Sequence, residues 1–171
     1  MAFRTVVYHF YNILFEYSKN EIVGYISDDI SFTNIQKFYE VIESFKNNKN
    51  FLYYFSICDL PYPNCVPDHA FVTRNSILKL GFLFPSGLEH GYCDHYIGRL
   101  YKEIGCGLLD TSKFITHDRT GNDETYFIKS YQKDENGLTC DDRDLLTFNS
   151  FCDNYLDTHK KIILSSNDNR I

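Results

Sequence analysis

Hydrophobic residues recur at steps of three and four along three long segments of the chain, which is the spacing of an amphipathic helix. These segments are residues 5–18, 34–45 and 145–162. Asn34 is suited to begin the second helix, because its side chain can accept a hydrogen bond from the backbone of the first turn. Shorter helices are expected at 75–80 and 94–104, because a glycine that can end a helix follows each.

Four short segments rich in apolar, β-branched or aromatic residues predict strands. They are residues 21–27, 51–58, 70–72 and 113–116. Three prolines exclude regular structure between residues 59 and 68. Because strands alternate with helices, the chain is expected to adopt an α/β layer fold. A single domain is expected over residues 1–164, followed by a polar tail at 165–171.

The composition is that of a globular protein with one hydrophobic core. The chain has 171 residues, of which 43% are hydrophobic and 17% aromatic. Its formal net charge is −6 and no block of Lys or Arg stands out, which disfavours nucleic acid as a partner. No apolar stretch approaches the roughly 20 residues that a membrane-spanning helix needs. The six cysteines show neither a CxxC pair nor a zinc spacing, so reduced thiols and a cytoplasmic location are expected.

The strand predicted at 21–27 ends in two adjacent carboxylates, Asp28 and Asp29. Residues that follow the carboxyl end of a buried strand lie where open α/β sheets bind ligands. Two hard oxygen donors suit Mg²⁺ or Mn²⁺, and such a metal in turn suits a diphosphate. Taken alone, the pair is explained more simply as a polar turn after a strand, because Asp is a common turn residue.

Three further segments concentrate polar groups that can do chemistry. They are PDHAFVTR at 67–74, GFLFP with EHGYCD between residues 81 and 94, and THDRTGNDETY at 116–126. A single His or Asp in a loop usually serves the scaffold. The order and spacing of these segments, together with the Asp pair, therefore carry more information than any one of them.

In that order and spacing the chain resembles GT-A glycosyltransferases, specifically the small family-2-like, nucleotide-sugar-dependent type that also occurs in phages and large viruses. The matching stretches are GYISDDISF, HAFVTR, LGFLFP, EHGYCDHYIGRLYKEIG and ITHDRTGNDETY. The resemblance as a whole runs from about Phe10 to Tyr131. The resemblance implies a GT-A-like mixed sheet flanked by helices. It also implies transfer of a sugar from a nucleotide-diphosphate sugar donor to a hydroxyl of a glycan or protein acceptor.

The resemblance also implies roles for four residues. Asp28 and Asp29 would hold Mn²⁺ or Mg²⁺ at the donor diphosphate, and His117 would complete the metal or diphosphate site. Asp94 would be the catalytic base that removes the proton from the acceptor hydroxyl. A helix N-terminus favours a negative charge, so an N-cap position would suit this role. The alternative is that Asp94 serves only as the N-cap.

A second set of residues, from the same segments, is expected to contact the sugar, the diphosphate or the acceptor. The set comprises Asp68, His69, Arg74, Glu89, His90, Tyr92 and Arg119. For Arg119, a surface salt bridge is an equal alternative.

The chain departs from the family at its start, because Asp28 stands close to Met1. In the family, a strand and a loop that hold the nucleotide come first, and a further strand and helices then follow before the acidic motif. The fold is therefore expected to be N-terminally truncated. A sheet without its first strands exposes an edge and an apolar helix face. A homodimer, or a partner chain that supplies the missing half, is expected to cover them.

Two other classes of function remain open on the sequence. A non-catalytic remnant that acts as a binding or interaction module would fit the missing nucleotide half. A metal-dependent phosphoesterase could use Asp28, Asp29, Asp94 and His117 around a metal pair. The absence of an HxH pair disfavours this second class.

Overall fold

The computed structural model describes the backbone of seven segments, residues 7–26, 30–47, 54–57, 69–89, 91–110, 114–117 and 131–165. The helices are α1 (Val7–Tyr17), α2 (Ile35–Asn47), α3 (Arg74–Leu80), α4 (Cys93–Glu103) and α6 (Cys140–Leu164). The strands are β1 (Ile22–Tyr25), β2 (Ile30–Phe32), β3 (Tyr54–Ile57), β4 (His69–Thr73), β5 (Gly107–Asp110) and β6 (Ile115–His117).

Four strands form one mixed sheet in the order β1-β4-β3-β5, and β2 pairs with β6 in a second, two-stranded sheet. Strand β4 is antiparallel to both β1 and β3, whereas β5 is parallel to β3. The strands β1, β3 and β5 therefore run in the same direction, and their carboxyl ends lie at one edge of the larger sheet. The expected mixed α/β architecture is confirmed.

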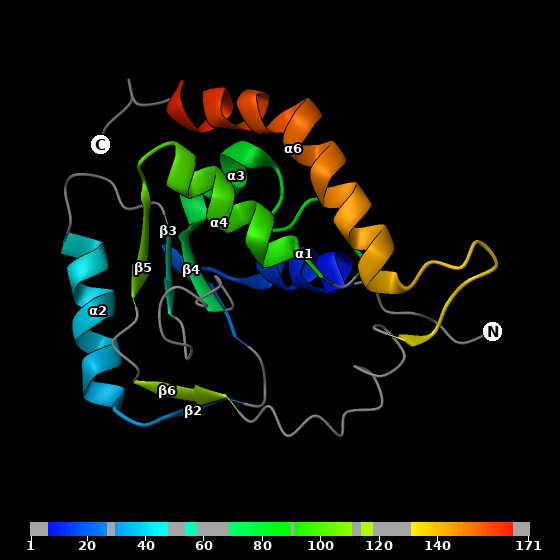
Figure 1. Ribbon diagram of the computed structural model, residues 1–171. Coiled ribbons are helices and arrows are strands. Elements are labelled where there is room, and N and C mark those ends of the chain that lie inside the picture. Colours follow the sequence, from blue (N-terminus) through cyan, green and yellow to red (C-terminus); the bar gives the residue numbers. More distant parts are fainter. Residues whose placement is uncertain are drawn as a thin grey trace.

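Strand β4 separates two hydrophobic cores because successive side chains of a strand point to opposite faces. Ala70 and Val72 belong to the larger core, which α1, α3, α4 and α6 also build. Phe71, between them, belongs to a smaller core with residues of α2 and β6. Helix α6 lies over α3 and α4 on the side of the larger core (Figure 1).

The larger core is centred on α4, whose side chains Tyr96, Leu100 and Tyr101 are completely buried. The Tyr101 hydroxyl donates a hydrogen bond of 2.6 Å to Ser76 on α3, so its polar end is satisfied inside the core. Burial of these rings fixes α4 between the sheet and α6.

The helices predicted from the sequence are confirmed. Two of the residues expected at their ends are confirmed as well. The backbone N–H of Lys37 donates to Oδ1 of Asn34 at 2.9 Å, which is the N-cap bond expected before α2. Gly81 ends α3 with φ of 80°, a left-handed conformation that glycine adopts without a steric penalty.

The expected N-cap role of Asp94 is wrong. Helix α4 begins at Cys93, its N-cap is Tyr92, and Asp94 lies inside the first turn. Tyr92 has φ of 62°, and it is the one non-glycine residue with positive φ in the described backbone. An aromatic residue rarely adopts this conformation, so sequence reasoning favoured the aspartate.

Strands β2 and β5 were not expected from the sequence. Each contains only three or four residues, and such a strand is defined by its partner rather than by a pattern of its own. Among the described helices, none combines the length and the apolar character needed to cross a membrane.

Candidate functional site

The carboxyl-end edge of the larger sheet brings together segments that the sequence singled out. Tyr25 and Ile57 end β1 and β3, and His69 begins β4 at the same edge. His69 is in register with Ile57, which is in register with Asp110 at the end of β5. The segments that follow β1 and β3 therefore begin at this end of the sheet. The segment that precedes β4 ends there too. This is the kind of edge at which open α/β sheets bind ligands.

Asp28 and Asp29 lie outside the described residues, in the connection between β1 and β2. Ile30, which follows Asp29 directly, is the register partner of His117 in the smaller sheet. Paired residues of antiparallel strands have Cα atoms about 5 Å apart. The backbone thus brings His117 next to the residue that adjoins the Asp pair. The side chain of His117 is outside the described part.

No cluster of three or more His, Cys, Asp or Glu side chains that could hold a metal ion occurs among the described residues. Asp28, Asp29 and the imidazole of His117 lie outside the described part of the chain. The metal site predicted from the sequence therefore remains a prediction.

Asp94 forms a carboxylate–imidazole pair with the residue that follows it. Its Oδ1 atom accepts the backbone N–H of His95 at 2.8 Å and lies 2.9 Å from Nδ1 of the His95 ring. An ionised carboxylate can only accept, so the proton of the neutral ring belongs on Nδ1. Both side chains are partly exposed at the start of α4. The sequence analysis did not single out His95, although its place beside Asp94 was a signal for it.

Tyr92 orients the start of α4 through its ring. The ring centroid lies 5.2 Å from that of His95 and 5.4 Å from that of Phe148 on α6. A left-handed, non-glycine residue carries backbone strain that the surrounding packing must hold in place, and such residues concentrate at functional sites. The described contacts of Tyr92 fit a positioning role, and its contact with a substrate stays a prediction.

Helix α6 holds the segment that leads into α4. The buried carboxylate of Asp144, 1% exposed, accepts the backbone N–H groups of Glu89 and Gly91 at 2.7 and 2.6 Å. Burial raises the pKa of Asp144, and the two backbone hydrogen bonds oppose that shift. Sequence reasoning missed Asp144, because an aspartate within a long polar helix segment is usually solvated.

Glu89 is tied to the same helix by its side chain. Its Oε2 atom accepts from a guanidinium nitrogen of Arg143 at 3.1 Å, and the thiol of Cys140 lies 3.6 Å from the same oxygen. Arg143 also donates to Asp134 at 2.8 Å. The predicted contact of Glu89 with an acceptor is untested, and its observed contacts are with α6.

Arg74 and His69 are placed within the scaffold. A guanidinium nitrogen of Arg74 donates to the carbonyl and the hydroxyl of Ser18 at 2.5 and 2.7 Å, and the group lies over the ring of Phe15. These contacts join the start of α3 to the end of α1. His69 is 1% exposed. The substrate contacts expected of Arg74 and His69 stay predictions, and Asp68, His90 and Arg119 lie outside the described residues.

Comparisons of the chain with protein-family models, with curated proteins and with solved structures find no match.

Proposed function

We propose that this chain is a metal-dependent glycosyltransferase, or part of one, of GT-A-like fold. It would transfer a sugar from a nucleotide-diphosphate sugar to an acceptor hydroxyl on a glycan or protein. One observation supports the proposal most: Ile30, which directly follows the Asp pair in the chain, is the register partner of His117 in the pairing of β2 with β6. This pairing joins two parts of the chain, far apart in sequence, to which the proposal assigns the metal ligands.

The donor set fits a divalent cation. Asp28 and Asp29 supply carboxylate oxygens, which suit both Mn²⁺ and Mg²⁺. His117 supplies an imidazole nitrogen, which suits Mn²⁺ better than Mg²⁺. When bound, the cation would neutralise the charge that grows on the departing diphosphate. The two aspartates and the histidine would hold the cation and the diphosphate in place.

Asp94 would act as the general base at the acceptor. Its carboxylate would take the proton of the acceptor hydroxyl while that oxygen forms a bond to the anomeric carbon. The bond from the anomeric carbon to the diphosphate oxygen breaks, and the diphosphate leaves with the electron pair. The hydrogen bond from His95 to Oδ1 would fix the rotamer of the carboxylate, leaving Oδ2 for the acceptor.

Calorimetric titration of UDP- and GDP-sugars, with and without Mn²⁺, tests the donor site. We expect binding that requires the metal and that Asp29→Asn abolishes. Asp153→Asn, which removes an exposed carboxylate from α6, is the matched control and should leave binding unchanged. Equal affinity with and without metal would remove the role proposed for the Asp pair.

Turnover separates the proposed reaction from its alternatives. Asp94→Asn should retain donor binding and lose sugar transfer by about 10²-fold or more, the usual contribution of a general base. Release of phosphate from simple esters without a sugar acceptor would favour a metal-dependent phosphoesterase. Donor binding without any turnover would favour a non-catalytic binding module.

A further inference from the structure

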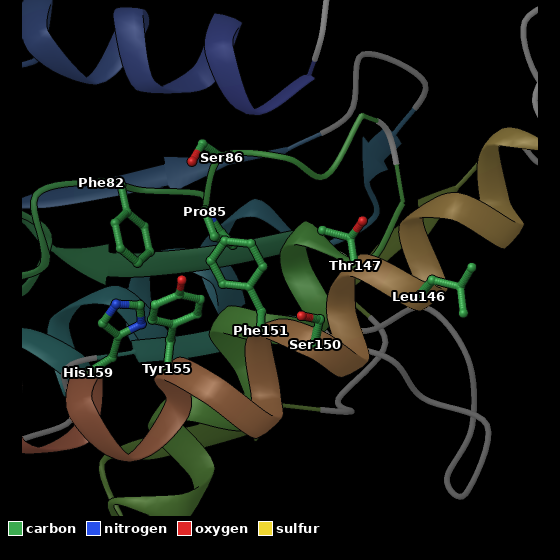
Figure 2. Close-up of a pocket in the computed structure, with 9 residues that line it drawn as sticks. All are labelled: Phe82, Pro85, Ser86, Leu146, Thr147, Ser150, Phe151, Tyr155 and His159. Carbon is green, nitrogen blue, oxygen red and sulfur yellow. The ribbon is translucent and has the colours of Figure 1, made fainter.

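A hollow lies between α6 and the segment that follows α3. It is an open hollow of about 650 Å³. Figure 2 shows Phe82, Pro85 and Ser86 on one side of it and side chains of α6 on the other. Neither Asp94 nor any residue expected to bind the donor lines it.

Aromatic rings line the hollow on both sides. The rings of Tyr155 and His159 are nearly parallel, 16° apart in orientation, with centroids 6.1 Å apart. Phe151 lies 5.2 Å from Tyr155, and Phe82 meets His159 edge-on at 5.1 Å. Tyr155 is 49% exposed, so part of its surface is open to a ligand. The hollow is therefore lined by mutually packed rings with an accessible face (Figure 2).

Hydroxyl groups line the hollow beside the rings, and the protein leaves their hydrogen-bonding capacity largely unused. In the described structure, neither the hydroxyl of Ser86 nor that of Thr147 bonds to another protein group. The Ser150 hydroxyl accepts from Asn154 at 3.2 Å and keeps its own proton for another acceptor. A ligand rich in hydroxyl groups could pair with all three.

The hollow carries no formal charge among the described residues that line it. His159 is its one titratable group near neutral pH, and burial lowers the pKa of His159, so the ring is neutral there. Its Nδ1 atom is bonded to the hydroxyl of Tyr96 at 2.8 Å, which leaves Nε2 for a ligand. Without a fixed charge, the hollow offers no ion pair to a phosphate, a carboxylate or an ammonium group.

We infer that this hollow binds a neutral saccharide. A pyranose ring presents C–H groups on its faces and hydroxyls around its rim, and the hollow presents aromatic faces beside hydroxyl groups and a neutral imidazole. The side chains of an apolar peptide segment would cover the rings but would offer no hydrogen-bond partner to the serine and threonine hydroxyls. The inference does not depend on glycosyl transfer.

Saturation-transfer NMR and ¹⁵N-edited spectra of the full chain test this inference. The probes are methyl glycosides of neutral hexoses and neutral disaccharides, added with EDTA and without nucleotide so that the proposed metal site does not contribute. We expect saturable binding with shifted amide signals in α6 between Leu146 and His159. Glucuronate and glucose 6-phosphate should bind more weakly than the neutral sugars of the same ring configuration.

Two variants assign the binding to the hollow. Tyr155→Ala should weaken the affinity about tenfold, as truncation of an aromatic anchor does, and Thr147→Val should weaken it severalfold. Tyr17→Ala removes a tyrosine of α1 that is 75% exposed, and it should have no effect. Thermal unfolding of each variant verifies that the fold is intact.

Three outcomes would overturn the inference. The first is that no neutral saccharide binds at millimolar concentration. The second is that binding survives Tyr155→Ala and Thr147→Val unchanged. The third is a concentration-dependent dimer that Tyr155→Ala dissociates, because a second copy would then occupy the hollow. Failure of metal-dependent donor binding would leave this result untouched, so the two proposals fail separately.

Discussion

The Asp144 carboxylate joins α6 to the backbone that precedes α4. Because it accepts two backbone N–H groups while buried, its replacement leaves at least one of those donors without an acceptor. We expect Asp144→Asn to lower the free energy of unfolding by about 1–3 kcal/mol, as measured by urea denaturation. Asp141→Asn, three residues earlier in α6, is the control. An equal loss in both variants would show that the two backbone bonds of Asp144 are not the cause.

His159 gives the stability a pH dependence whose sign follows from burial. Its pKa in the folded chain lies below its ordinary value of about 6.5. A histidine with a lowered folded pKa stabilises the fold above its unfolded pKa, and that contribution is lost as pH falls through the folded pKa. The thermal midpoint of the wild type should therefore fall more steeply below pH ~6.5 than that of His159→Asn. Parallel curves would contradict this.

The pairing of β1 with β4 depends on a residue without a side chain. A Cβ atom on Gly24 would lie 2.5 Å from Cδ1 of Phe71, its register partner across the two strands. We expect Gly24→Ala to cost about 1–3 kcal/mol in urea denaturation, because the ring must leave its packed position. In the double variant Gly24→Ala with Phe71→Leu, the two losses should be less than additive. Additive losses would show that the collision is not the cause.

The N-terminus of α6 is fixed by a reciprocal cap. The Thr139 hydroxyl accepts the backbone N–H of Asp142 at 3.1 Å, and the Asp142 carboxylate accepts the backbone N–H of Thr139 at 2.9 Å. Thr139→Ala should reduce the free energy of unfolding by about 1 kcal/mol. Thr158→Ala, at an exposed position inside the same helix, should be neutral or slightly stabilising, because alanine has the higher helix propensity. Far-UV circular dichroism during denaturation measures both.

The surface on the α1 side of the molecule favours association. Strand β1 lies at an end of the four-stranded sheet as described, and α1 exposes four large apolar side chains. They are Phe10, Ile13, Leu14 and Tyr17. An open strand edge beside an apolar helix face tends to bind another surface. The association expected from the sequence stays a prediction.

Sedimentation over a range of concentrations tests that expectation. The wild type should associate, and the double variant Ile13→Glu with Leu14→Glu should shift it toward the monomer, because burying the new charges is costly. Ile35→Glu, on the exposed start of α2, is the control and should leave the association unchanged. A wild type that is monomeric at all concentrations, with a high thermal midpoint, would argue against an uncovered surface.

The sequence by itself determined the helices and the longer strands, because their spacing, caps and glycines are local signals. Asn34 and Gly81 lie where those signals predicted, and the run that ends at Tyr25 is a strand. The sequence also supplied the chemistry of the proposed site, since the residue types and their order in the chain are fixed without a fold.

Only the tertiary structure decided which of these residues meet. The pairing of Ile30 with His117, and the bonds of Asp144 to Glu89 and Gly91, join positions far apart in the chain. The periodicity of the sequence cannot predict such pairs, because it reports only on neighbours within one helix or strand. Tyr92 took the cap position expected of Asp94 for the same reason: packing of its ring against α6 offsets a backbone conformation that local preferences disfavour.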